Sequence, residues 1–264
     1  MKPVFTFTRG DTPLLLSVPH AGTRVSAAIL QRFTNHARDL PDTDWFVDRL
    51  YDWVTEAGAG MLVANLSRYV IDLNRSPDDA PLYSGATTSL VPLKSFDGQS
   101  LYAADQQPDM TETGLRCEEF WRPYHDKLAT ELERLRQRFG YVILLDAHSI
   151  RSRVPMLFEG RLPDLNLGSF RGASADPSLI SASFSALRDH PEMSSVLDGR
   201  FQGGYITRHY GRPHEGVHAL QLEMAQSVYM QECPPVYDAG RASNVVPVLN
   251  SLIQTMLSWV PQSA

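Results

Sequence analysis

The segment of residues 116–146 restricts the possible folds more than any other part of the sequence. Residues 116–139 place apolar side chains at three- and four-residue steps, which is the period of an amphipathic helix. Gly140 is well placed to end this helix, and the apolar run 141–145 then predicts a fully buried strand that ends at Asp146. Such a helix followed by a buried strand is typical of α/β proteins with a mostly parallel sheet.

The rest of the chain repeats this alternation. Residues 76–112 are rich in Pro, Gly, Ser and Asp and predict a long excursion from the sheet. We find no internal repeat or long linker, so residues 1–264 predict one catalytic domain, a three-layer α/β/α sandwich around a largely parallel mixed central sheet. The patterns predict further strands at 13–20, 61–66, 69–73, 154–158 and 217–223, and further helices at 44–56, 177–187 and 241–259.

The composition excludes several classes of protein. A formal net charge of −6 argues against nucleic acid or an anionic membrane as the main partner. No apolar run approaches the length of a membrane span, and the first residues lack a signal-peptide core. Cys117 and Cys233 show no metal-binding spacing and are expected to stay reduced. The sequence therefore predicts a cytoplasmic protein.

Three polar residues are expected at the ends of these elements. His20 closes the first strand, Asp44 opens the first helix, and His148 follows the strand 141–146. Two His and one carboxylate form a familiar catalytic zinc shell with an open position. The spacing is long and irregular, so each residue also has an ordinary interpretation: a turn histidine for His20, and a helix-start acid beside the cap Asp42 for Asp44.

His148 is the strongest of the three candidates. Asp146 precedes it by two residues, so both side chains point to the same side of an extended segment and the acid could orient the imidazole. Surface or packing roles are expected for His36, His125, His190, His214 and His218.

Arginines also gather at expected strand ends and loops. In SRYVIDLNRSP, Asn74 and Arg75 offer an amide and a guanidinium fork that suit a carboxylate. In GGYITRHYG, Tyr205 and Arg208 stand beside paired glycines that permit close backbone approach. A small anionic substrate would explain this placement, although surface salt bridges or coincidence would explain it too. The full set is Arg68, Arg75, Arg151, Arg153 and Arg208.

Glu223 ends the apolar run of residues 217–223, where an acid is unusual. A carboxylate near a metal-bound water would serve as a general base and later as a general acid. The ordinary interpretation is an acid at the start of a helix.

The chain resembles the N-formylglutamate amidohydrolase family, nearly from end to end. The resemblance rests on these strings: SVPHAG, DTDWFVDRLYD, SRYVIDLNRSPD, LLDAHSIRS, LFEGRLPDLNLG, GGYITRHYG and GVHALQLEMAQ. It implies a zinc-carboxypeptidase-like α/β/α fold and one zinc ion per chain. It also implies hydrolysis of N-formyl-L-glutamate to glutamate and formate, the last step of a histidine degradation route.

The same resemblance implies roles for individual residues. Aspartoacylase, a distant relative, also carries a DLNR string, which corresponds to residues 72–75 here. His20 and His148 would bind zinc and Glu223 would be the general base. Arg68 would face the scissile carbonyl, while Asn74 and Arg75 would hold a carboxylate, helped by Arg208 or Arg151. The related enzymes take a carboxylate ligand three residues after the first His, where this chain has Thr23. Asp44 is the expected replacement, with Asp42, Asp48 and Asp146 as alternatives.

Three other functions remain open from the sequence. A related zinc deacylase would act on another N-acyl amino acid. A metal-free Ser/His/Asp hydrolase would need a nucleophile, but the G-x-S-x-G elbow is missing. A binding module for acidic amino acids would bind glutamate without releasing formate. The oligomeric state has no signal in the sequence.

Overall fold

The computed structural model describes residues 3–81 and 88–261, and a seven-stranded sheet forms its centre. Strands β2, β3, β4 and β7 run parallel, whereas β1 and β5 pair antiparallel with β3 and β7. The predicted α/β fold with a mixed, mostly parallel sheet is therefore confirmed. In spatial order the strands are β1 (Phe5–Thr8), β3 (Gly60–Ala64), β2 (Leu14–Val18), β4 (Val142–Ile150), β7 (Val217–Ala225), β5 (Leu165–Gly168) and β6 (Ser195–Leu197).

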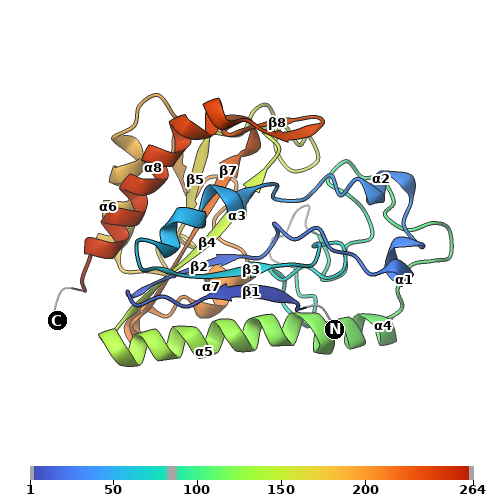
Figure 1. The fold of residues 1–264 in the computed structure, drawn as a ribbon, viewed down its shortest axis with the longest axis horizontal. Helices are drawn as coiled ribbons and strands as arrows, with labels where there is room; N and C mark the ends of the chain where they lie inside the picture. The colour runs from blue at the N-terminus through green and yellow to red at the C-terminus, as the bar shows by residue number, and fades with distance from the viewer. Residues whose placement is uncertain (1–2, 82–87, 262–264) are drawn as a thin grey trace.

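Helices cover both faces of the sheet and give three layers (Figure 1). Helix α5 (Arg122–Phe139) packs on one face, where Leu128 belongs to the same buried cluster as Leu144 of β4. On the other face lie α3 (Val47–Leu50), α6 (Pro177–Arg188) and α8 (Ala239–Ser258), whose apolar residues share a cluster with Ile143 and Leu145 of β4. Alternate residues of the apolar run 141–145 thus serve opposite layers, because successive strand side chains point to opposite faces.

The predicted helix at 116–139 is part of a longer helical segment. It begins in α4 (Met110–Arg116), capped by the Asp109 side chain, and passes through a π-helical turn, η2 (Cys117–Trp121), into α5. Gly140 ends α5 with a positive φ of 83°, as the sequence predicts. The remaining elements are α1 (Ala27–Leu30), α2 (Asn35–Arg38), η1 (Asp52–Thr55), α7 (Tyr205–Tyr210), η3 (Pro213–Glu215), η4 (Gln226–Val228), β8 (Met230–Glu232) and β9 (Pro235–Tyr237).

Two predicted strands are wrong. Residues 69–73 form turns, and Asp72 accepts a hydrogen bond from the Asn74 backbone N–H. Residues 154–158 also form a turn, in which two backbone N–H groups donate to the Val154 carbonyl. Both segments are apolar because they pack into buried clusters beside or against the sheet. A buried run without strict alternation was therefore wrongly interpreted as a strand.

The predicted helix at 44–56 is broken into α3 and η1. Phe46 adopts a left-handed conformation with φ of 63°, and Tyr51 separates the two short helices. Asp44 therefore lies in the loop before α3 instead of in a helical first turn. This loop frees its carboxylate to reach the end of β4. Strands β1, β5 and β6 were not predicted.

The excursion predicted at 76–112 is irregular up to α4 where it is described, and residues 82–87 lie outside the described residues. Cys117 is buried and Cys233 exposed, and both are free thiols. Within residues 3–81 and 88–261, no helix is long and apolar enough to cross a membrane.

Candidate active site

The site forms where three neighbouring parallel strands end. His20 lies two residues beyond β2, His148 lies near the end of β4, and Glu223 lies near the end of β7. Strands β4 and β7 are in register so that His148 is the direct partner of Glu223. Ligand-binding groups gather beyond the carboxyl ends of strands in α/β sheets, and His20, His148 and Glu223 line one cavity at this edge.

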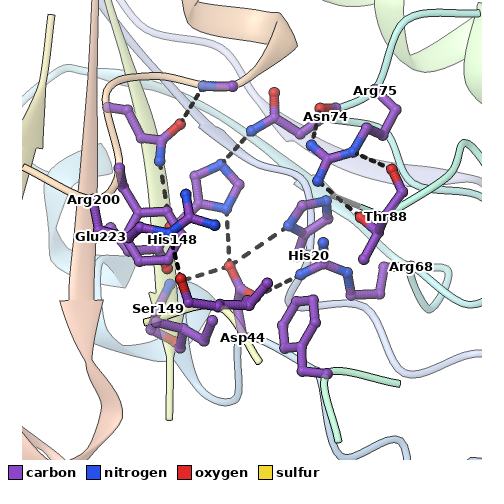
Figure 2. A pocket seen from close by; sticks show the side chains of 16 residues that line it. His20, Asp44, Arg68, Asn74, Arg75, Thr88, His148, Ser149, Arg200 and Glu223 are labelled. Atoms are coloured by element: carbon purple, nitrogen blue, oxygen red, sulfur yellow. Dashed lines mark hydrogen bonds and ion pairs between the residues drawn. The ribbon is translucent and has the colours of Figure 1, made fainter. Parts of the chain in front are cut away.

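His20, Asp44 and His148 converge in the buried part of the site, as Figure 2 shows. Asp44 Oδ2 lies 2.9 Å from His148 Nδ1 and 3.8 Å from His20 Nδ1. One ligand atom from each residue lies within 4.8 Å of the others. The loop before α3 is held in place for this by the Ser149 backbone N–H, which donates to Asp44 Oδ2 at 3.1 Å.

The outer nitrogen of each imidazole faces a second carboxylate. His20 Nε2 lies 2.7 Å from Asp72 Oδ1, and His148 Nε2 lies 2.9 Å from Asp146 Oδ2. The Asn74 amide nitrogen lies 2.9 Å from His148 Nε2 and donates to Asp146 at 3.0 Å. Carboxylates in this position fix the tautomer and the ring orientation of metal-binding histidines.

The pKa values of His20 and His148 are shifted in opposite directions. Burial and the Arg68 guanidinium lower the pKa of His20, despite the carboxylates of Asp72 and Asp44. Burial also opposes the charged form of His148, but Asp146 and Asp44 outweigh it and hold the pKa of His148 well above its usual value. The position beside Asp44 therefore attracts positive charge.

The three residues fit a metal ion. His20 Nδ1 is buried and makes no hydrogen bond, while it faces the Asp44 carboxylate. The buried carboxylates of Asp44 and Asp72 lie beside Arg68, and that of Asp146 lies beside His148, so acidic groups predominate around the trio and favour a divalent cation there. Two imidazole nitrogens and a carboxylate oxygen are a donor set that transition metals accept. The trio can hold a metal through the two Nδ1 atoms.

Glu223 stands beside this trio as a buried acid. Burial raises its pKa to about 8, with the Asp44 charge adding to the effect and His148 opposing it. The Gln221 amide donates to Glu223 Oε2 at 3.3 Å, and Gln221 Oε1 in turn accepts from the Gly204 backbone N–H at 2.7 Å. A carboxyl group with a pKa near neutrality can both accept and deliver a proton.

Arg68 brings a buried cation next to the trio. It donates to Asp72 Oδ2 at 2.7 Å and lies 3.7 Å from Asp44 Oδ1. The same Asp72 therefore contacts both Arg68 and His20, which links the loop after β3 to the metal-binding residues. Asp72 has its pKa well below the usual range because Arg68 and His20 outweigh the effect of burial.

Two further arginines line the cavity, which encloses about 590 Å³ including its open mouth. Arg75 donates to the backbone and hydroxyl oxygens of Thr88 and to the Asn74 carbonyl. Arg200 enters from the opposite side in Figure 2 and donates to the Leu157 carbonyl at 2.6 Å. The cavity thus combines a metal-compatible trio, a buried acid and cationic walls.

The structure brings most of the predicted site residues together, but not all of them. His20, Asp44, Arg68, Asn74, Arg75, His148 and Glu223 line the cavity. Arg151 does not line it and pairs with Asp97 at 3.0 Å. Arg208 donates to the Gly203 carbonyl outside the cavity wall, and Tyr205 packs against Trp121.

The alternative carboxylates have other partners. Asp42 accepts hydrogen bonds from the Tyr69 hydroxyl and the Phe96 backbone N–H, and Asp48 is exposed. Asp146 faces the outer nitrogen of His148, as the D-A-H spacing predicts, and also accepts from Ser17. Only Asp44 among these four acids joins His20 and His148 in the metal-compatible group.

Sequence reasoning missed several cavity residues. Gln221 could have been found, because it precedes Glu223 by two residues and therefore points to the same face of β7. Arg200 and Phe201 carry no comparable signal, since they lie in the loop between β6 and α7. Phe96 reaches the cavity from the excursion after β3 and lies 4.9 Å from the Arg68 guanidinium.

Comparison with known proteins adds independent evidence. The family model for N-formylglutamate amidohydrolase matches residues 12–230. N-formylglutamate deformylase of Pseudomonas putida is 49% identical over 260 residues, covering 98% of this chain and 97% of that protein. The Pseudomonas aeruginosa deformylase is 50% identical, covering 98% of both.

A solved structure agrees with the sequence relatives. The crystal structure of an N-formylglutamate amidohydrolase from Ralstonia eutropha JMP134 has a TM-score of 0.82 and 26% identity, and the match covers 95% of this chain and 96% of that one. The family model spans most of the chain, and the two deformylases span nearly all of it at about half identity. This chain therefore belongs to the N-formylglutamate amidohydrolase family.

Proposed function

We propose that this protein hydrolyses N-formyl-L-glutamate to L-glutamate and formate with the help of a zinc ion. The observation that carries the proposal is the near-complete match to two deformylases, at 49% and 50% identity. A buried His, Asp and His group beside a buried glutamate, in a cavity with cationic walls, supplies chemistry suited to that reaction.

Zinc would be held by His20, Asp44 and His148, one ion per chain. When bound, it supplies an activated water at neutral pH and polarises a carbonyl oxygen. Asp72 and Asp146 keep the two imidazoles in the orientation that presents Nδ1 to the ion. These residues prepare the site without themselves touching substrate.

Glu223 performs the proton transfer. Its carboxylate accepts a proton from the attacking water and delivers it to the nitrogen of the leaving glutamate. Burial raises the pKa of Glu223 and so favours the protonated form that delivers the proton, whereas a cation bound at the trio would lower this pKa and favour the carboxylate that accepts it. The Gln221 amide directs Glu223 Oε2 and limits its rotation.

Arginines stabilise and position the substrate. Arg68 faces the carbonyl oxygen that becomes negative during attack, and pre-oriented cations are most effective where charge develops. Arg75 holds the α-carboxylate, which lies next to the scissile amide, and Asn74, whose amide already donates to Asp146, positions Arg75. The tie from Arg75 to the Asn74 carbonyl, and the contact of Asn74 with His148, keep this pair close to the trio.

Formate release tests the proposal. The purified protein is treated with a chelator, dialysed, reloaded with zinc and assayed on N-formylglutamate and N-acetylglutamate. We expect activity on the formyl substrate to disappear with chelation and return with zinc. Faster turnover of the acetyl compound would favour a related deacylase, and activity that survives complete metal removal would contradict zinc dependence.

A further inference from the structure

The cavity also has apolar side chains in its wall, and they come from one cluster beside the end of β4. Phe96 and Ile150 are buried members of this cluster, and Leu157 and Phe201 pack against it. The proposed substrate is small and carries two carboxylates. Apolar surface therefore suits only its methylene groups and the hydrogen of its formyl group.

Phe96 stands between this cavity and a second hollow on the surface. The second hollow encloses about 770 Å³ including its open mouth, and the exposed side chains of Leu93 and Met156 line part of it. Phe96 lines both spaces, together with Thr88 and Leu157. Only 8% of Phe96 is exposed, so its ring fills the boundary between the two spaces.

The Phe96 backbone is held in a defined position. It lies in a closed turn, in which the Ser95 N–H donates to the Gln99 carbonyl at 2.9 Å. The Phe96 N–H donates to Oδ2 of the buried Asp42 at 2.8 Å, and the Tyr69 hydroxyl donates to the same oxygen at 2.7 Å. A ring fixed through its backbone in this way can serve as a rigid wall.

The ring also lies next to the proposed reaction centre, 4.9 Å from the Arg68 guanidinium. In the proposed reaction Arg68 faces the carbonyl oxygen and Glu223 faces the leaving nitrogen. Figure 2 shows Arg68 and Glu223 on opposite sides of Asp44. The third substituent of the carbonyl carbon points away from the nitrogen, and therefore towards the side where Phe96 lies.

We infer that Phe96 restricts the acyl group of the substrate to formyl, because its ring closes the acyl end of the cavity. This inference rests on the proposed function. A formyl group presents only hydrogen to the ring, whereas the methyl of an acetyl group needs the space that the ring occupies. Without the ring, the cavity would open into the outer hollow, which has room for longer acyl chains. One carbon more or less in an apolar pocket changes kcat/KM about 10- to 200-fold.

The experiment measures glutamate release from N-formyl-, N-acetyl- and N-propionylglutamate by the zinc-loaded wild type, Phe96→Ala and Phe96→Leu. Glutamate is the common product, so one assay serves all three substrates. In Phe96→Ala we expect the acetyl-to-formyl ratio of kcat/KM to rise about 10- to 200-fold over wild type, with a rise for the propionyl compound as well. Phe96→Leu keeps part of the wall and should give a smaller rise.

Two control variants change the surroundings of the boundary. Leu93→Ala alters a residue that lines the outer hollow but not the cavity, and it should leave all three substrates unchanged. Phe201→Ala removes an equal ring from a part of the cavity wall that does not border the outer hollow. It should not raise the acetyl-to-formyl ratio.

The outcomes separate this inference from the proposed function. An unchanged ratio in Phe96→Ala, or an equal rise in Phe201→Ala, would overturn the role of Phe96, while formate release by the wild type would leave the proposed function intact. A wild type that releases no formate would overturn the proposed function and this inference with it. Circular dichroism and zinc content verify the fold of each variant. If Phe96→Ala does not fold, the ratio in Phe96→Leu decides in the same way.

Discussion

The two halves of the cavity are built in different ways. Strands β4 and β7 carry Asp146, His148, Gln221 and Glu223 in two registered pairs, so the backbone ladder sets their spacing. The opposite half comes from the loop after β3, residues 67–75, whose shape depends on side chains. There Asp72 accepts from Arg68, from the Asn74 backbone and from His20.

This difference predicts how each half responds to substitution. A side chain on a registered strand can be changed without moving its neighbours, because the ladder persists. A loop held by one buried carboxylate loses several contacts when that carboxylate changes. We therefore expect mutations in the strand half to affect chemistry selectively, and mutations in the loop half to affect stability, metal binding and substrate binding together.

The largest selective effect is expected at Glu223. Glu223→Gln keeps the size of the side chain and the strand register but removes the proton acceptor. Turnover should fall about 10²- to 10⁴-fold, while zinc content and the midpoint of urea unfolding stay close to wild type. Activity within a few-fold of wild type would remove Glu223 from the mechanism.

Asp72→Asn and Asp146→Asn form a matched pair, one for each half. Both remove the carboxylate behind a histidine, and both should weaken metal binding about 10- to 100-fold. Asp72→Asn also leaves the buried Arg68 without its closest acid, which should cost about 3–5 kcal/mol of unfolding free energy. Asp146→Asn should cost less, about 1–2 kcal/mol, since His148 keeps Asp44 as a buried acidic partner. Urea titration of the metal-free proteins makes the comparison, and equal losses would contradict it.

Arg75→Lys tests which of the two substrate carboxylates this arginine binds. The change keeps the charge but loses the guanidinium fork, so kcat/KM should fall about ten- to a hundredfold. Because Arg75 is assigned to the α-carboxylate, kcat/KM should fall about equally for N-formylglutamate and N-formylglutamine. A loss confined to N-formylglutamate would show that Arg75 binds the side-chain carboxylate instead.

Low pH should lower the unfolding free energy through His125, which contacts the loop half of the cavity. Residue His125 of α5 hydrogen bonds through Nε2 to the Leu73 carbonyl, and burial lowers its pKa to about 3. The unfolded chain takes up this proton near pH 6.5, so stability falls as the pH drops from about 6.5 towards 3. The slope from this group is at most about 1.4 kcal/mol per pH unit. His125→Gln should flatten the profile of unfolding free energy between pH 6.5 and 4.5, and an unchanged slope would contradict the assignment.

The sequence predicts the strand half better than the loop half. The D-A-H spacing correctly places Asp146 and His148 on one side of an extended segment, because that follows from the strand period alone. Their pairing with Gln221 and Glu223 depends on the register between two strands whose paired residues are 75 positions apart, which no local pattern encodes. Residues 69–73 were predicted as a strand, since buried turns and buried strands share the same apolar composition.

The arginines show even more clearly that local sequence patterns do not encode contacts between distant segments. Arg151, Arg153 and Arg208 follow apolar runs or glycines, yet none lines the cavity, while Arg200 does. The direction of a long side chain depends on the group to which it donates a hydrogen bond. Here Arg200 donates to the Leu157 carbonyl and Arg208 to the Gly203 carbonyl. Those contacts exist only in the folded chain. Arg68 and Arg75 come from the same predicted set, were singled out by the match to the DLNR string, and do line the cavity.

Metal analysis of the wild type and of His148→Ala tests the central claim most directly. The account predicts one zinc per chain in the wild type, and loss of that zinc in His148→Ala with the fold retained by circular dichroism. His214→Ala, which changes an exposed histidine, serves as the matched control and should keep its zinc. Full zinc retention in His148→Ala would contradict a metal centre formed by His20, Asp44 and His148.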